Sequence, residues 1–267
     1  MKSSGSFGQC FVSVFGPVME AMGYSRKLYI FHRLVNEKIV QRVSFKKYSG
    51  GSFTIQWANL PLIGEYEIEA FMDDWLLQDI LEKGEPHYWS YTNDIDEYDV
   101  WEKYDYGTGE TSVEIVQHYE KQMPICLEVC KKHLFPFLDS VYDYETYNNQ
   151  MKWIYKRGVG AVTDDSLAGY NIYQLSLYFE DYETAWKSMK KFLDTNLKGR
   201  SLTEISPYWK ELLESSIENY HKMREAAEKG DRETIVAYLK GNEEQSLQSY
   251  IKNYYGKRAL EKYLNSN

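Results

Sequence analysis

The chain has 267 residues, of which 43% are hydrophobic and 27% are charged, so it is long enough and apolar enough to bury a core. Its mean hydropathy is -0.59, and no run approaches the ~18 apolar residues that a membrane span needs, which excludes a membrane. The formal net charge of -9 disfavours binding to phosphate backbones. We therefore expect no nucleic-acid partner and favour a basic protein partner.

The cysteines and the first apolar segment indicate the compartment. Three cysteines cannot all pair with one another. The first apolar segment is interrupted by Gly16, Pro17 and Glu20, unlike a secretion signal. We therefore expect a reducing, cytoplasmic location.

A one-faced helix is predicted over 7–22. Its apolar residues recur at helical spacing. Pro17 predicts a kink, and Gly23 predicts a left-handed end to the helix. The residues of the predicted apolar face are Phe7, Phe11, Val14, Phe15, Val18 and Met22.

Three short strands are predicted next. In the third, Phe53, Ile55 and Trp57 alternate with polar residues, which is typical of a half-buried sheet. Turns are expected at Asn36-Glu37 and at 49–52. The predicted strands span 27–35, 39–48 and 53–60.

The middle of the chain mixes helix, loop and strand signals. Apolar spacing predicts a helix over 68–83, and alternation predicts a short strand over 87–91. An acidic loop is expected at 93–106. Thr111 and Glu114 then form a capping box for a long helix that Phe135, before a proline, should end.

The remainder of the chain is predicted to be helical. Ser206-Pro207 opens one of its helices, which Gly230 ends, and Asp231 is expected to cap a short helix that Gly241 ends. The fold class is therefore α+β: an N-terminal antiparallel sheet of three to five strands flanked by helices, then an all-helical C-terminal subdomain packed against it. Gly158-Val159-Gly160 divides a 1–158 α+β domain from a 159–267 helical subdomain. The predicted helices span 143–157, 167–179, 182–197, 206–229 and 243–264.

The segment 17–33 resembles the opening of a bacterial family known only as a domain of unknown function. The proline near the helix end, the glycine–aromatic step, the basic pair and the aromatic-x-arginine strand correspond to Pro17, Gly23-Tyr24, Arg26-Lys27 and Phe31-His32-Arg33, and a later strand to Phe53-Thr54-Ile55-Gln56. The similarity covers about residues 7–150, with Leu28 where the family has glycine. It implies an α+β bacterial domain without assigned catalytic residues, and by analogy an immunity-like setting.

A second resemblance is confined to one hairpin. The segment 177–185 is similar to the turn of a tetratricopeptide hairpin, with Tyr182 and Ala185 in place but Glu180 where glycine is usual. Because stability requires about three repeats, we interpret it as an ordinary helix pair.

The candidate binding site is the acidic aromatic segment, residues 94–106. Six acidic residues against Lys103 give a local net charge of -5. Interleaved aromatic residues could anchor a basic partner that the carboxylates steer. A solvated loop and a divalent-cation site are the alternatives, although Tyr98 and Asp99 break the calcium-loop template. The candidate binding residues are Asp94, Asp96, Glu97, Tyr98, Asp99, Trp101, Tyr104 and Asp105.

Other residues capable of chemistry have ordinary structural interpretations. Cys126, Cys130 and His133 have spacing that could start a zinc site, but the same spacing is a core stripe. His32 could titrate, although a single strand histidine is more often structural. No phosphate loop, dinucleotide fingerprint or nucleophile elbow is present, so no catalytic residue, metal ligand or cofactor is assigned.

The first functional hypothesis is therefore a cytoplasmic bacterial protein-binding module, immunity-like in role, that uses the acidic aromatic segment. A divalent-metal-dependent hydrolase that uses the same carboxylates is the alternative, and a helical scaffold is the third.

Overall fold

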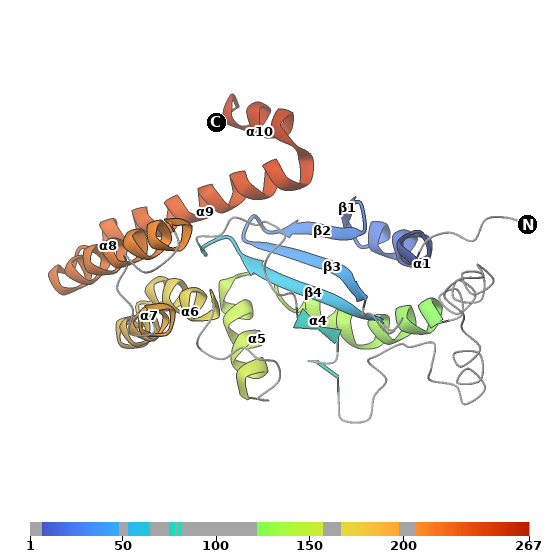
Figure 1. Cartoon of the computed structure of the whole chain (residues 1–267), viewed down its shortest axis with the longest axis horizontal. Helices are drawn as coiled ribbons and strands as arrows, with labels where there is room; N and C mark the ends of the chain where they lie inside the picture. Colours follow the sequence, from blue (N-terminus) through green and yellow to red (C-terminus); the bar gives the residue numbers. More distant parts are fainter. Residues whose placement is uncertain are drawn as a thin grey trace, which may run out of the picture. The chain divides into compact units, whose positions relative to one another are not determined.

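A computed structural model of the chain confirms the α+β class (Figure 1). It divides into two compact units. Unit 1 comprises Met1–Leu60 and Asp73–Tyr147, and unit 2 comprises Pro61–Met72 and Asn148–Asn267. The predicted boundary at 158–160 lies outside the described residues, and the predicted packing of one subdomain on the other stays a prediction. The structure describes residues 7–47, 53–64, 75–77, 80–81, 122–156, 167–197 and 207–266.

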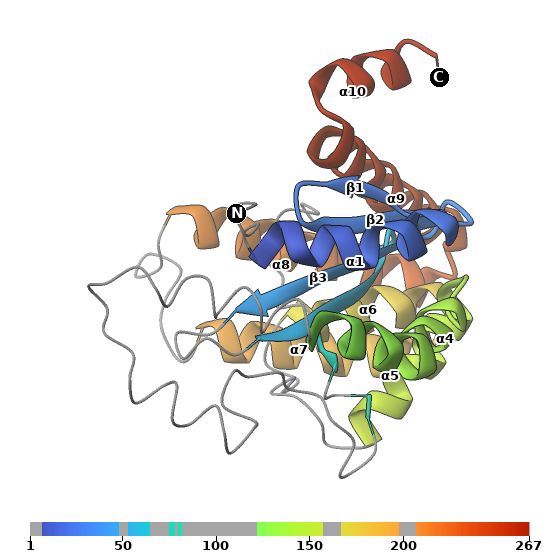
Figure 2. The same cartoon turned by 90° about the vertical axis from the view of Figure 1, so that its right-hand side faces the viewer.

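The sheet of unit 1 has five strands in the order β1-β2-β3-β4-β5, so neighbours in the chain are neighbours in space. The helix α1 runs alongside it (Figure 2). Each strand with a described register pairs antiparallel with its neighbour. The elements are α1 (Phe7–Ala21), β1 (Ser25–Lys27), β2 (Ile30–Val35), β3 (Ile39–Lys47), β4 (Phe53–Pro61) and β5 (Trp75–Leu76).

Helix α1 agrees with its prediction in extent and end. Pro17 lies inside it, and Gly23 follows with φ 82°, the left-handed conformation that glycine adopts without strain. The buried face centres on Phe11, Phe15 and Met19, so Met19 replaces Val14 and Val18, which are half-buried.

Two strand predictions need correction. The predicted 27–35 strand is two strands, because Leu28 has φ 54° and turns the chain between Lys27 and Ile30. The predicted half-buried face of 53–60 is also wrong, since Thr54 is 0% exposed and β4 is buried on both faces. The alternation of apolar and polar residues along a strand shows which side chains share a face, but it does not show what packs on each face of the sheet.

The helix predicted over 68–83 is wrong where the structure describes it. Trp75 and Leu76 form β5, which pairs antiparallel with Gln56 and Trp57 of β4. Pairing with an existing strand therefore overrides the helical spacing. The strand predicted over 87–91 and the capping box at Thr111 lie outside the described residues.

The long helix continues past its predicted end. Residues 122–129 are helical and lead into a π-helical turn, η2 (Cys130–Leu134), then α4 (Phe135–Asp139). Pro136 closely follows the π-helical turn and lies inside the continuous helix, so it does not end the helix at Phe135. The predicted 143–157 helix is confirmed as α5 (Tyr144–Lys156).

An aromatic cluster forms the core between α1 and the sheet. The ring of Phe7 meets those of Phe45 and Phe53 at centroid separations of 4.5 and 4.9 Å. Phe11 meets Phe31 at 5.6 Å. Such edge-to-face and tilted pairs are favourable beyond their buried area, so α1 is fixed on the sheet by its rings.

Unit 2 contains antiparallel helices, with α8 beside α9 and α6 beside α7 (Figure 1). Gly230 ends α8 with φ 70°, and Asp231 caps α9 by accepting from the backbone N–H of Thr234 at 3.1 Å, as predicted. The helices are α6 (Leu167–Tyr178), α7 (Tyr182–Leu197), α8 (Pro207–Lys229), α9 (Arg232–Tyr255) and α10 (Lys257–Leu264).

The predicted helix end at Gly241 is wrong. Helix α9 runs through Gly241 and ends at Gly256, which has φ 91°. A glycine inside a helix costs about 1 kcal/mol, and the packing of a long helix offsets that cost. The left-handed turn at Gly256 instead divides the predicted 243–264 helix into the end of α9 and α10.

Two polar contacts fix the C-terminal half of α6 against the first part of α9. Glu180, in the α6–α7 turn, forms an ion pair with Arg232 at the start of α9. Gln174, six residues before Glu180, donates to the hydroxyl of Tyr238, six residues after Arg232, at 2.8 Å. Glu180 has φ 59°, the conformation that explains why tetratricopeptide turns place glycine there.

No helix within the described ranges is both long enough and apolar enough to cross a membrane.

Candidate functional site

The predicted binding residues lie outside the described residues. These residues are Asp94, Asp96, Glu97, Tyr98, Asp99, Trp101, Tyr104 and Asp105. Their role stays a prediction.

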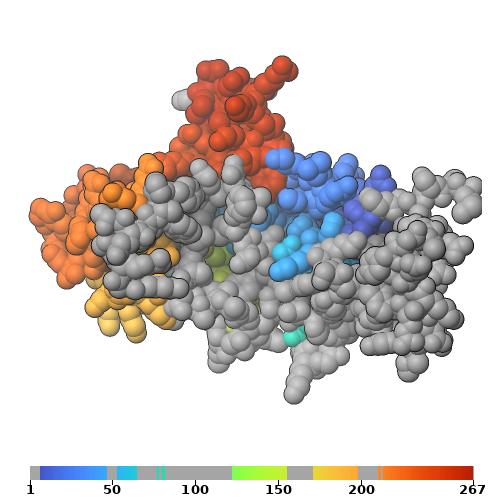
Figure 3. All heavy atoms as spheres, in the orientation of Figure 1, coloured from blue at the N-terminus to red at the C-terminus, as the bar shows by residue number. Residues whose placement is uncertain are grey.

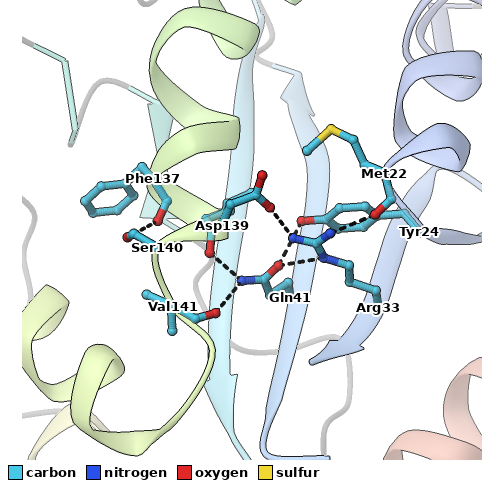
Figure 4. A network of polar contacts seen from close by, with 9 residues as sticks. Met22, Tyr24, Arg33, Gln41, Phe137, Asp139, Ser140 and Val141 are labelled. Atoms are coloured by element: carbon cyan, nitrogen blue, oxygen red, sulfur yellow. Dashed lines mark hydrogen bonds and ion pairs between the residues drawn. The ribbon is translucent and has the colours of Figure 1, made fainter. Parts of the chain in front are cut away.

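The most connected polar site that the structure describes is the Arg33 cluster, formed by Tyr24, Arg33, Gln41 and Asp139 (Figure 4). Arg33 donates from Nε to the Gln41 side-chain oxygen at 2.8 Å and from a terminal nitrogen to the Met22 carbonyl at 2.7 Å. Its other terminal nitrogen forms an ion pair with Asp139. The Arg33 guanidinium therefore connects three parts of unit 1: the chain just after α1, strand β3 and helix α4.

Strand register brings the centre of the cluster together. Arg33 on β2 lies directly opposite Gln41 on β3. Facing residues of antiparallel strands project to the same side of the sheet, so their side chains meet. The turn residues Asn36 and Glu37, with φ 49° and 55°, close the hairpin that sets this register.

Gln41 connects the sheet to the end of α4. Its side-chain nitrogen donates to the carbonyls of Leu138 at 2.6 Å and Val141 at 3.2 Å. The Leu138 carbonyl, in the last turn of α4, also accepts from the Val141 N–H at 3.0 Å, so Gln41 supplies a further donor to it and a donor to the Val141 carbonyl just after the helix. The positive charge of Arg33 near this helix end is also favourable to the helix dipole.

Burial decreases across the cluster. Gln41 is 0% exposed, whereas the Arg33 side chain is 20% exposed and that of Asp139 is 52% exposed. Burial raises the pKa of Tyr24 above its usual range, although the positive charge of Arg33 opposes the shift. Tyr24 therefore stays protonated at neutral pH and donates to Gln41 at 3.1 Å, with the guanidinium stacked 4.4 Å from its ring centre.

The Arg33 cluster has a structural role, because its polar groups bind one another. A neutral tyrosine, an amide and an internally paired arginine supply donors and acceptors that are directed at one another. The arrangement holds α4 and α1 on the sheet, and its exposed edge is the Arg33–Asp139 pair.

Comparison with known proteins adds no assignment. No protein-family model, no curated protein and no solved structure matches the chain. The resemblance of segment 17–33 to a bacterial family stays a prediction.

The cysteine–histidine set does not form a metal site. Cys126, Cys130 and His133 are described, and among the described residues no three His, Cys, Asp or Glu side chains are placed to hold a metal ion. The reason is local, because η2 begins at Cys130 and its wider turn removes the α-helical spacing that would align all three. Burial, and then the neighbouring Cys130, raise the pKa of the Cys126 thiol, which disfavours a thiolate.

His32 is a buried structural histidine. It is 1% exposed and lies opposite Arg42 in the β2–β3 ladder. Burial, with a smaller effect from Lys27, lowers its pKa to about 4, so it is neutral at physiological pH.

Sequence reasoning missed the Arg33 cluster as a unit. Arg33 entered only through the family resemblance, and Asp139 had no role. The hairpin turn at Asn36-Glu37 was the available signal, because folding the two strands about it places Arg33 opposite Gln41. No local pattern points to Asp139, which lies 106 residues away.

Proposed function

We propose that this chain is a protein-binding module that captures a basic protein through the acidic aromatic segment. The observation that carries the proposal is charge: residues 94–106 have a net charge of -5 within a chain of -9. Concentrated charge steers encounter, and neighbouring Trp101 and Tyr104 are residue types that dominate binding energy at interfaces.

The narrower proposal is an immunity-like role in a bacterial cytoplasm. It is supported only by the resemblance of segment 17–33. In that role the partner is a basic toxin-like protein, which the negative charge suits.

The described residues nearest to the acidic aromatic segment on each side are packed into unit 1. On the N-terminal side, β5 pairs with β4, and Leu77 and Leu81 are buried. On the C-terminal side, Met123 and Cys126 are buried, and Phe137 packs edge-on against Trp57 at 5.3 Å. The nearest described residues on both sides of the segment therefore belong to unit 1.

Charge reversal of the segment tests the proposal. The change is Asp94→Lys, Asp96→Lys, Glu97→Lys and Asp99→Lys together. Affinity-tagged full-length chain captures its partners from bacterial lysate, and the retained proteins are identified. We expect wild type to enrich basic proteins, with loss of at least about tenfold in the variant, because attraction becomes repulsion.

A matched control reverses four exposed carboxylates elsewhere, so the change in net charge is identical. These are Glu183 on α7 and Glu211, Glu214 and Glu218 on α8. Undiminished capture by the segment variant, or equal loss in the control, would contradict the proposal. A rise in wild-type melting temperature with Mg²⁺, reversed by chelation and absent in the segment variant, would instead support the hydrolase alternative.

A further inference from the structure

Helix α10 separates its apolar and charged residues onto opposite sides, yet none of its residues is buried. Leu264 is 51% exposed, and the other apolar positions are only half-buried. The apolar residues are Ala259, Leu260, Tyr263 and Leu264; the charged ones are Lys257, Arg258, Glu261 and Lys262.

After the end of α9 the chain reverses, and α10 runs back beside it (Figure 1). The turn is made at Gly256, and the Tyr263 hydroxyl donates to the carboxylate of Glu244 at 3.1 Å. Helical spacing places an apolar face on each of the two helices, and the two faces together are here called the hairpin seam. It comprises Leu247, Ile251 and Tyr255 of α9 and Leu260, Tyr263 and Leu264 of α10.

The hairpin seam is only partly covered. Tyr255 is 52% exposed, while Leu247 and Ile251 are half-buried. The atoms of α10 are open on the face of the molecule shown in Figure 3. A helix of 8 residues is too short to be stable in water without packing, and α9 covers the apolar strip only in part, so the rest of the strip is a surface on which a further neighbour can pack.

The charges along the α9–α10 hairpin indicate which kind of neighbour fits the hairpin seam. The end near Gly256 carries Lys252, Lys257 and Arg258, a net charge of +3. The far end carries three acidic residues and one lysine, a net charge of -2. These are Glu243, Glu244, Glu261 and Lys262.

We propose that the hairpin seam is an interface with a second copy of this chain, paired about a two-fold axis. Antiparallel pairing of two hairpins places the positive end of each copy against the negative end of the other. The same operation joins the two apolar strips into a four-helix arrangement. A self-complementary surface of this kind is what a two-fold dimer requires.

Disruption of the strip is the first test. Leu260→Glu with Leu264→Glu should raise the dimer dissociation constant at least about tenfold, because charge replaces apolar contact. The matched control is Val236→Glu, a substitution of a residue 40% exposed in the first half of α9. Sedimentation of the full chain from about 1 to 200 μM reports the mass, and circular dichroism reports folding.

Charge exchange is the second test and separates a dimer from other occupants. Glu243→Lys with Glu244→Lys makes both ends positive, and Lys257→Glu with Arg258→Glu makes both ends negative. Each variant alone should be monomeric, and a mixture of the two should form a heterodimer. Tyr263→Phe controls for loss of the hydrogen bond to Glu244 and should remain dimeric.

A wild-type chain that stays monomeric to 200 μM overturns the proposal, as do charge variants that fail to pair when mixed. A monomeric chain that is markedly destabilised by the leucine substitutions would show that the strip is covered within one chain.

Discussion

At the residue scale, Leu28 occupies a backbone conformation that suits glycine. Its φ of 54° is left-handed, and its side chain is 74% exposed, so little burial repays the strain. We expect Leu28→Gly to stabilise the protein by about 0.5–1 kcal/mol after allowing for the greater freedom of the unfolded chain. Thermal unfolding should show a rise of about 1–4 °C.

Tyr29, the next residue of the same turn, provides the control for Leu28→Gly. The ring of Tyr29 lies so close to Gly8 that a Cβ there would approach it to 2.5 Å. Tyr29→Gly removes this packing and should lower the melting temperature. If Leu28→Gly is also destabilising, the turn is not strained as the geometry indicates.

His32 predicts a pH dependence of stability. Its pKa is about 4 in the folded chain and 6.5 in the unfolded chain. As the pH falls below about 6.5, the unfolded chain takes up the proton first, so stability is lost towards pH 4 and is fully present above pH 7. We expect about 1–2 kcal/mol of loss between pH 7 and pH 5 from this residue.

Urea unfolding across that range measures the dependence. His32→Gln should flatten the slope relative to wild type, even if the variant is less stable overall. His221→Gln, which changes an exposed histidine of α8, should leave the slope as it is. Equal slopes in wild type and His32→Gln would show that other groups carry the dependence.

At the element scale, we expect the buried Gln41 amide to contribute more to the stability of the Arg33 cluster than the half-exposed Arg33–Asp139 ion pair. Gln41→Leu leaves the Tyr24 hydroxyl and the Arg33 Nε without their partner, and it removes one of the donors to the Leu138 carbonyl. We expect a loss of about 2–4 kcal/mol in the free energy of unfolding. Asp139→Asn weakens an ion pair that is half exposed and should cost under about 1 kcal/mol.

Chemical denaturation of both variants decides the ranking. A larger effect from Asp139→Asn would mean that the ion pair, rather than the amide, fastens α4 to the sheet. Hydrogen exchange should show the α4 amides opening sooner in Gln41→Leu, because the loss is local to that contact.

At the scale of the whole molecule, negative charge is unevenly distributed. The acidic aromatic segment accounts for -5 of the total of -9, while the Gly256 end of the hairpin is positive. Two proposals therefore address different surfaces: capture of a basic partner and pairing of hairpins. Because both depend on charge, raising the salt concentration should weaken each, and the matched variants keep their effects separate.

Local signals along the chain determine much of the fold. The ends of α8 and α9 at Gly230 and Asp231, and the turn at Asn36-Glu37, were predicted correctly. Each depends on residues within one turn of the chain, where conformation and capping are settled by immediate neighbours. The helix ends predicted at Gly241 and before Pro136 were wrong, because the packing of a longer helix outweighed the local preference.

The sequence by itself determined the α+β class, most helix positions and the concentration of acidic charge. Tertiary structure decided that Trp75 belongs to a strand, that β4 is buried on both faces, and that Gln41 reaches the end of α4 across 97 residues. The reason is that propensity and periodicity act along the chain, whereas burial and partner choice depend on which distant segments the folded chain brings together.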